Sequence, residues 1–159
     1  MRREEVLVLI GKCRQFRPED APSCSEILRA NAGIDASAPP ELRKAMLAAE
    51  VPDLMLDRAA LYYVAVCESD LGVVGVGGLD LNEIRFLAVS PSCQRLGIGR
   101  LLLEHLEAMV PPALFKDVFV YASPDAEGFY RACGYRAGGG ETLEVHGHLV
   151  PTIFMTRRL

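Results

Sequence analysis

The chain has 159 residues, of which 50% are hydrophobic and 24% charged, and this balance predicts one globular domain over residues 1–159. No apolar stretch reaches the roughly 18 residues of a membrane helix, and no cleavage site follows the short run Val6–Ile10, so we expect neither a membrane span nor a secretory signal. A formal net charge of −4 provides no general basic field, which argues against a nucleic-acid-binding protein.

Two helices are expected in the amino-terminal third. One follows Pro18–Asp20, carries Ile27 and Leu28 inward and ends near Gly33. The patch Ala36–Pro40 is too short for an interdomain linker and instead starts a second helix, because apolar residues recur behind Pro40 at helical spacing. These residues are Leu42, Ala45, Met46 and Ala49.

The middle of the chain reads as a β-meander followed by a helix. Short β-rich runs predict strands at Leu61–Cys67, Val73–Leu79 and Glu83–Val89. A helix then begins near Ile98 and stops at Pro111, with Arg100, Glu104 and Glu107 on its polar face. Its apolar stripe consists of Ile98, Leu101, Leu102, Leu106, Met109 and Val110.

The carboxy-terminal third adds strands around one short helix. Val118–Ala122 is a strand, Ser123 is the N-cap of the next helix, and Gly134 is its left-handed terminator. Tyr135–Ala137 and Leu149–Arg157 supply two last strands around a loop at Gly138–Gly140. The element order predicts a mixed α/β sheet with helices on both faces.

One loop carries a recognisable chemistry. Gly97 and Gly99 fall where the helix after the third meander strand must begin, so its free backbone N–H groups and the positive end of its dipole can bind a phosphate. A P-loop needs Gly-Lys-Ser/Thr, and the dinucleotide fingerprint needs a small residue where Leu102 stands. Neither of those alternatives fits.

The loop Gln94-x-x-Gly97-x-Gly99 resembles the pyrophosphate loop of the GNAT superfamily of N-acetyltransferases, Gln/Arg-x-x-Gly-x-Gly/Ala. Ile84–Pro91 resembles the fourth strand of that family, and Phe129–Tyr135 resembles its Phe-Tyr-x-x-x-Gly-Phe/Tyr segment. The resemblance covers Leu61 to the carboxy terminus. It implies a central, mostly antiparallel sheet that splays apart between the fourth and fifth strands. Many relatives carry asparagines after the fifth strand, where this chain has Ser123 and Ala126.

The resemblance implies acetyl-CoA as cosubstrate and no metal. The pantetheine arm is expected to lie in the splay, bonded to the backbone of Leu87, Ala88 and Val89. The pyrophosphate is expected on the loop and helix start, formed by Gln94, Arg95, Leu96, Gly97, Ile98, Gly99 and Arg100.

Two residues are candidates for proton transfer. In the family a tyrosine at the position of Tyr130 lies beside the CoA sulfur, and a phenol is acidic enough to protonate a leaving thiolate; the alternative is that Tyr130 only packs. Some relatives use a glutamate at the position of Glu83 as base, usually through water. A strand period of two would put Glu83 on one face with Arg85, Leu87 and Val89; an exposed glutamate paired with Arg85 is the alternative.

Cysteines and histidines carry no chemistry of their own in this interpretation. The five scattered cysteines include no Cys-x-x-Cys pair, so we expect reduced thiols, a cytoplasmic protein and a structural role for Cys133. Only His146 and His148 are close together, in a turn or strand, and we expect them on the surface.

The expected reaction is direct attack of a primary amine of a small molecule on the thioester of acetyl-CoA. The acidic chain slightly favours a cationic or zwitterionic metabolite. Alternatives are transfer of another acyl group, acetylation of a peptide or protein, and a non-catalytic acyl-CoA-binding regulatory module. A homodimer is compatible with each of these functions.

Overall fold

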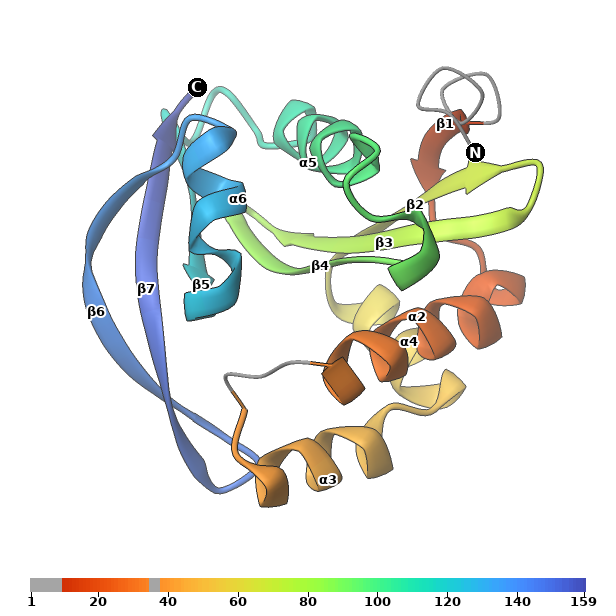
Figure 1. The fold of residues 1–159 in the computed structure, drawn as a ribbon. Helices are drawn as coiled ribbons and strands as arrows, with labels where there is room; N and C mark the ends of the chain where they lie inside the picture. Colours follow the sequence, from red (N-terminus) through yellow and green to blue (C-terminus); the bar gives the residue numbers. More distant parts are fainter. Residues whose placement is uncertain (1–9, 35–37) are drawn as a thin grey trace.

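The computed structural model describes residues 10–34 and 38–159; most of the run Val6–Ile10 and the first residues of the patch Ala36–Pro40 lie outside them. Its centre is a seven-stranded sheet in the order β1-β2-β3-β4-β5-β7-β6 (Figure 1). The strands are β1 (Ile10–Gln15), β2 (Tyr63–Ser69), β3 (Gly72–Asp80), β4 (Glu83–Val89), β5 (Asp117–Ala122), β6 (Arg136–Val145) and β7 (His148–Arg158).

The sheet opens in its middle. All neighbouring strands are antiparallel except β4 and β5, which run parallel and pair only at Glu83 with Phe119 and at Ile84 with Val120. Beyond Ile84 the two strands separate. The mixed α/β fold and the splay between the fourth and fifth strands are thus confirmed.

Helices cover both faces of the sheet (Figure 1). They are α2 (Ala21–Ile34), α3 (Pro40–Ala49), α4 (Pro52–Leu61), α5 (Ile98–Ala108) and α6 (Glu127–Ala132), with 3₁₀ turns η1 (Pro18–Asp20), η2 (Pro91–Cys93) and η3 (Pro124–Ala126). The helices α2 and α4 pack on one face, whereas α5 packs on the other face of β1–β4. No helix of the described residues has the length and apolarity that a membrane crossing requires.

Helix α4 was not among the elements predicted from the sequence. Its N-cap position is Val51, which makes no side-chain hydrogen bond to the helix start, so the usual capping signal is absent. Met55 is its one fully buried residue, and a single buried residue gives no clear apolar stripe.

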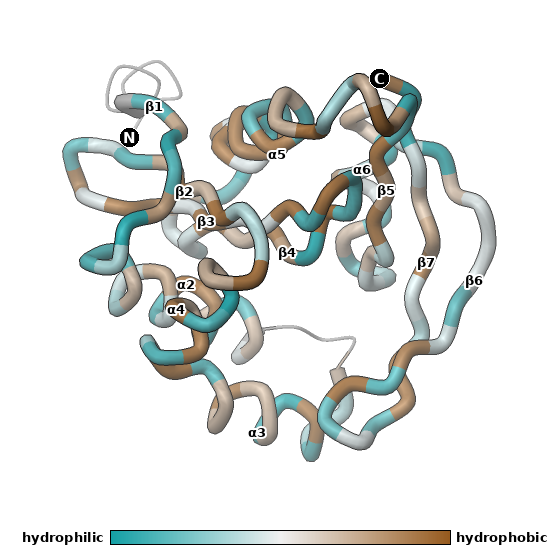
Figure 2. Tube along the Cα trace, turned by 180° about the vertical axis from the view of Figure 1, so that it is seen from behind, coloured by the Kyte–Doolittle hydropathy of each residue, from teal (hydrophilic) through white to brown (hydrophobic). Residues whose placement is uncertain are grey.

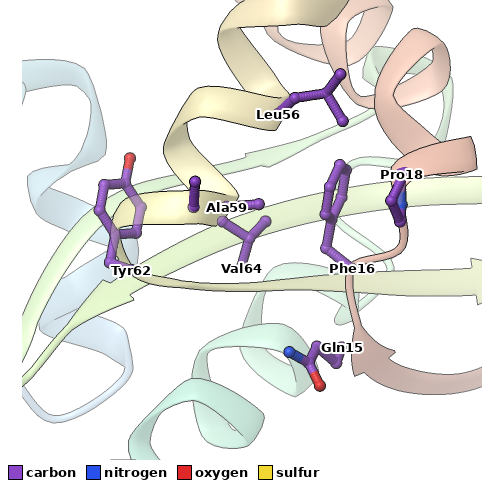
Figure 3. A pocket seen from close by; sticks show the side chains of 8 residues that line it. Gln15, Phe16, Pro18, Leu56, Ala59, Tyr62 and Val64 are labelled. Carbon is purple, nitrogen blue, oxygen red and sulfur yellow. The ribbon is translucent and has the colours of Figure 1, made fainter.

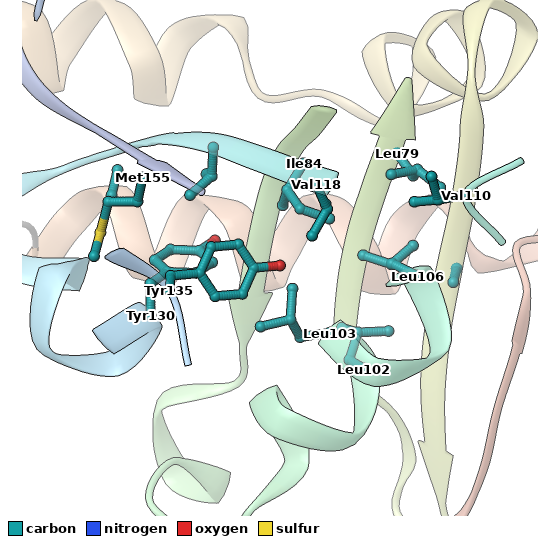
Figure 4. Close-up of a cluster of buried hydrophobic side chains, with 13 residues drawn as sticks. Leu79, Ile84, Leu102, Leu103, Leu106, Val110, Val118, Tyr130, Tyr135 and Met155 are labelled. Atoms are coloured by element: carbon teal, nitrogen blue, oxygen red, sulfur yellow. The ribbon is translucent and has the colours of Figure 1, made fainter. Parts of the chain in front are cut away.

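Figure 4 shows the hydrophobic core between α5, α6 and the sheet, and a polar network adjoins it. Glu107, expected on the polar face of α5, is only 8% exposed. Its carboxylate accepts one 2.8 Å hydrogen bond from the Tyr135 hydroxyl and another from Arg157. The expectation for Glu107 was therefore wrong. Spacing along the helix cannot reveal hydrogen-bond donors, here Tyr135 and Arg157, that come from residues much later in the chain.

The expected loop at Gly138–Gly140 is also wrong, because β6 runs through these glycines. The pairing with β7 shifts by one residue between Ala137 and Gly139, and Gly139 has φ +136°. The chain reverses instead at His146 and Gly147, which have φ +49° and +78°. The hairpin of β6 and β7 curves away from β5 and ends near α3, and β6 is mostly hydrophilic to neutral (Figures 1 and 2).

A bulge interrupts β4 where the splay begins. Phe86 pairs with Gly78 and Ile84 pairs with Leu79, so Arg85 has no partner on β3. Ile84 and Leu87 consequently both pack in the core beneath α5, whereas Phe86 packs on the side of α2 and α4. The uninterrupted period of two expected for Glu83, Arg85, Leu87 and Val89 is therefore wrong.

Candidate active site

A groove of about 1180 Å³ lies where β4 and β5 separate. Its walls are β4, the loop after it, α6, parts of α2, α3 and α4, and the turn between β6 and β7. This volume exceeds the roughly 300–1000 Å³ of an ordinary small-molecule pocket, so the groove is large enough for a long ligand together with a second one. The predicted residues that line it are Leu87, Ala88, Val89, Gln94, Arg95, Gly97, Gly99, Arg100 and Tyr130.

The loop after β4 presents free backbone donors at one end of the groove. Gly97 is the N-cap of α5 with φ +87°, and no side chain caps the helix. The first backbone bond to the helix start runs from Leu101 N to Gly97 O at 3.1 Å, so the N–H groups of Ile98, Gly99 and Arg100 have no intrahelical acceptor. This geometry suits a phosphate group.

The other residues of the loop differ in what they offer. Leu96 and Ile98 pack into the core cluster under the loop and do not line the groove with side chains. Arg95 lines it from a left-handed backbone with φ +63°. Arg100 also lines it, and its guanidinium donates to the Ala132 carbonyl at 2.8 Å, which ties α5 to the end of α6.

The free edge of β4 faces the groove. Ser90 N–H donates to Val74 O on β3, so by strand alternation the backbone groups of Leu87 and Val89 point away from β3, into the splay. Those of Ala88 are directed to β3. Val89 O accepts hydrogen bonds from Asn31 Nδ2 at 2.9 Å and Gln94 Nε2 at 3.2 Å.

Asn31 was missed by the sequence analysis. It lies in α2, and its side chain also accepts from Gln94 Nε2 at 3.1 Å, so α2 is joined to the loop and to the end of β4. A single asparagine within a helix gives no sequence signal for such a role, because its partners lie 58 and 63 residues away.

Tyr130 is buried in α6, with its ring 5.1 Å from that of Phe129 and 5.3 Å from that of Tyr135 (Figure 4). It nevertheless lines the groove, and no hydrogen bond of the described residues involves its hydroxyl. Burial raises the pKa of Tyr130 well above its usual value, so the phenol stays protonated at neutral pH.

Glu83 is the one predicted catalytic residue that does not line the groove. It lies at the start of β4, where the strand still pairs with β5, and one of its carboxylate oxygens is 3.6 Å from Arg85 Nη1. Its side chain is 25% exposed, so water can reach it.

The opposite end of the groove is formed by residues that were not predicted to lie together. Arg58 of α4 forms a two-pronged ion pair with Glu50 and lies over the Phe86 ring, 5.3 Å from its centroid. Arg85 lies over the Tyr62 ring at 5.6 Å. His146 is exposed, as expected, and it also lines the groove from the turn between β6 and β7.

A second cavity, of about 290 Å³, lies beside this end between β2 and α4 (Figure 3). Gln15, Phe16, Pro18, Leu56, Ala59, Ala60, Tyr62 and Val64 line it. Tyr62 lines both spaces.

Solved structures share this fold. A GCN5-related N-acetyltransferase from Rhodopseudomonas palustris matches with a TM-score of 0.85 and 23% identity, over 95% of this chain and 98% of that one. A phosphinothricin acetyltransferase from Sinorhizobium meliloti, solved in complex with acetyl-CoA, matches with a TM-score of 0.67 and 23% identity, over 95% of this chain and 89% of that one. Identities this low support the fold alone.

Sequence comparisons point to the same family. Serotonin N-acetyltransferase 2, chloroplastic, of Oryza sativa subsp. japonica is 41% identical over 49 residues, which are 31% of this chain and only 24% of the rice protein. The family model of the acetyltransferase (GNAT) domain matches residues 35–155. Because this match spans most of the chain and includes the splayed strands and the glycine loop, the chain belongs to the GNAT acetyltransferase domain family.

Proposed function

We propose that the protein transfers the acetyl group of acetyl-CoA to a primary amine of a small molecule. The observation that carries this proposal is the groove, in which the uncapped start of α5, the free edge of β4 and Tyr130 line one continuous space. Phosphate donors, a strand edge for an amide-bearing arm and a protonated phenol are the groups that binding and cleaving acetyl-CoA requires.

The residues divide the binding between them. The N–H groups of Ile98, Gly99 and Arg100 bind the pyrophosphate, with Arg95 adding positive charge at the rim. The pantetheine arm lies along Leu87 and Val89 as a short additional strand. The Gln94 side chain, bonded to Val89 O and Asn31, holds the loop against the end of β4.

In the transfer step the neutral amine attacks the thioester carbon, the new C–N bond forms and the C–S bond breaks. Tyr130 donates its proton to the departing sulfur. The ammonium proton leaves towards Glu83, and because Glu83 lies outside the groove wall, at least one water molecule must relay it. Cys133 carries no covalent step here, since burial raises the pKa of its thiol and keeps it protonated.

The compartment that we propose is the cytoplasm. All five cysteines are free thiols, and this supports a reducing environment. Cys13 and Cys67 lie directly opposite each other on β1 and β2 and nevertheless remain unbridged.

Two measurements test the function. Acetyl-CoA at 100 times its dissociation constant should raise the free energy of unfolding by about 2.7 kcal/mol, which a thermal shift detects. Release of free thiol from acetyl-CoA should then depend on added primary amines. A thermal shift without amine-dependent thiol release from any small molecule or peptide would identify an acyl-CoA-binding regulatory module, and release with peptides alone would identify a peptide acetyltransferase.

A further inference from the structure

The end of the groove farthest from the pyrophosphate loop contains a cation whose donors are unused. Arg85 lies four residues before Val89, about 13 Å along β4. Its closest carboxylate oxygens, on Glu83 and Asp80, are 3.6 and 3.9 Å away, too far for hydrogen bonds. No hydrogen bond within residues 10–34 and 38–159 uses its guanidinium, and Arg85 lines the groove.

The neighbouring cation, Arg58, already uses its donors in an ion pair. Arg58 donates from both terminal nitrogens to Glu50, and the two side chains are only 21% and 12% exposed. This pair is internally neutralised and closes the wall of the groove. Arg85 has only the two longer ion pairs with Glu83 and Asp80, so its hydrogen-bond donors remain for a ligand.

Tyr62 carries a second hydrogen-bond donor on the ring next to Arg85. Its ring lies under the Arg85 guanidinium and meets Phe86 edge-on, with ring centroids 6.3 Å apart. The two rings can approach because Gly78 lies between them on β3, where a Cβ atom would come within 2.6 Å of both. No hydrogen bond of the described residues involves the Tyr62 hydroxyl, and burial raises the pKa of this phenol, so it remains a donor.

Apolar side chains also line the groove. Leu28 of α2, Met46 of α3 and the Phe86 ring line the groove beside the two donors. A forked guanidinium with an adjacent phenol matches a carboxylate, and the apolar walls match a hydrocarbon or aromatic side chain. Arg85 lies two residues, about 7 Å, before Leu87, so a carboxylate on Arg85 leaves an amine a few Å away near the free edge of β4.

We propose that the acceptor is an amino acid with an apolar or aromatic side chain, and that Arg85 together with the Tyr62 hydroxyl binds its carboxylate. This inference rests on the proposed function and narrows it. An amine without a carboxylate would lack the charge-assisted hydrogen bonds that Arg85 offers, so its kcat/KM should be lower than that of the matching amino acid.

Matched acceptor pairs test the inference directly. Each pair is an amino acid and the amine that its decarboxylation gives: phenylalanine and 2-phenylethylamine, leucine and isoamylamine, methionine and 3-(methylthio)propylamine. Thiol release is measured at saturating acetyl-CoA, and rates are compared at equal concentrations of the unprotonated amine. We expect kcat/KM at least tenfold higher for the amino acid of at least one pair.

Variants assign the preference to Arg85. Arg85→Met keeps the aliphatic stem over Tyr62, and it should lower kcat/KM for the amino acid at least tenfold, mainly through KM, with less than a twofold change for the amine. Arg85→Lys should be intermediate, because it keeps the charge and loses the fork. Arg136→Met is the control, since Arg136 is an exposed residue of β6 that does not line the groove, and it should change neither rate.

The possible results separate the two proposals. Equal or faster acetylation of the decarboxylated amines, or an equal loss for both members of a pair in Arg85→Met, would overturn the carboxylate site and leave the transferase function standing. If no amine of any kind releases thiol while acetyl-CoA still raises the melting temperature, the proposed function fails and this inference fails with it. An unchanged acetyl-CoA thermal shift in Arg85→Met verifies that the variant is folded.

Discussion

Tyr130 and Tyr135 form a natural test of the acid role, because their rings are 5.3 Å apart and their hydroxyls have opposite environments. The Tyr130 hydroxyl makes no hydrogen bond within the described residues, so Tyr130→Phe should change the free energy of unfolding by less than about 0.5 kcal/mol. If this hydroxyl protonates the leaving sulfur, its removal should lower turnover about a hundredfold, which is about 2.7 kcal/mol in the activation barrier.

Tyr135→Phe should behave in the reverse manner. It removes the 2.8 Å hydrogen bond to the buried Glu107 carboxylate and costs about 1–3 kcal/mol of stability. For a domain of this size that is a fall in melting temperature of about 2–12 °C, while turnover of the folded fraction should change little. Melting temperatures and thiol-release rates of both variants complete the comparison. Near-normal turnover of Tyr130→Phe, with chemistry shown to be rate-limiting, would refute the acid role and make solvent the proton donor.

Three further changes test other parts of the molecule. Glu83→Gln should lower turnover at neutral pH and leave acetyl-CoA affinity nearly intact. Asp80→Asn, which alters the other carboxylate near Arg85, is the control and should not lower turnover. If Glu83→Gln turns over at the wild-type rate, Glu83 is only an ion-pair partner of Arg85. Gly99→Val should abolish the acetyl-CoA thermal shift because its Cβ meets the Phe129 ring at 3.2 Å, whereas Gly128→Val, in open space on α6, should retain it. Burial lowers the pKa of His105 below the 6.5 of an unfolded histidine, so stability that is present above pH 6.5 is lost as the pH falls through the folded pKa. His105→Gln, which still offers a partner to the Tyr63 hydroxyl, should flatten this fall in melting temperature.

Local patterns predicted the parts of the site that are contiguous in sequence. The strand Glu83–Val89 has the predicted bounds, and α5 begins at Ile98 as its apolar spacing and the two glycines indicate. Gly134 has the left-handed backbone expected at the end of α6, with φ +92°. Each of these features depends on residues within one turn or one strand.

Features that depend on distant partners could not be predicted. The bulge at Arg85 arises from pairing with β3, and nothing in the sequence Ile84-Arg85-Phe86 distinguishes a bulged strand from a regular one. The end of the groove near Tyr62 combines residues of α2, α3, α4 and β4, none of which has a functional spacing of its own. The cosubstrate loop could therefore be predicted from the sequence, whereas the residues around the acceptor could not.

The break between β4 and β5 also limits how cooperatively the two halves of the sheet unfold. Only two residue pairs join the two halves of the hydrogen-bond ladder, so β1–β4 and β5–β7 can open as separate units held together mainly by the core beneath α5. A ligand lying along β4 would bridge the break and delay amide hydrogen exchange at Leu87 and Val89. The side chains of Asn31 and Gln94 occupy the Val89 carbonyl, so this part of the interior strand edge cannot pair with another polypeptide.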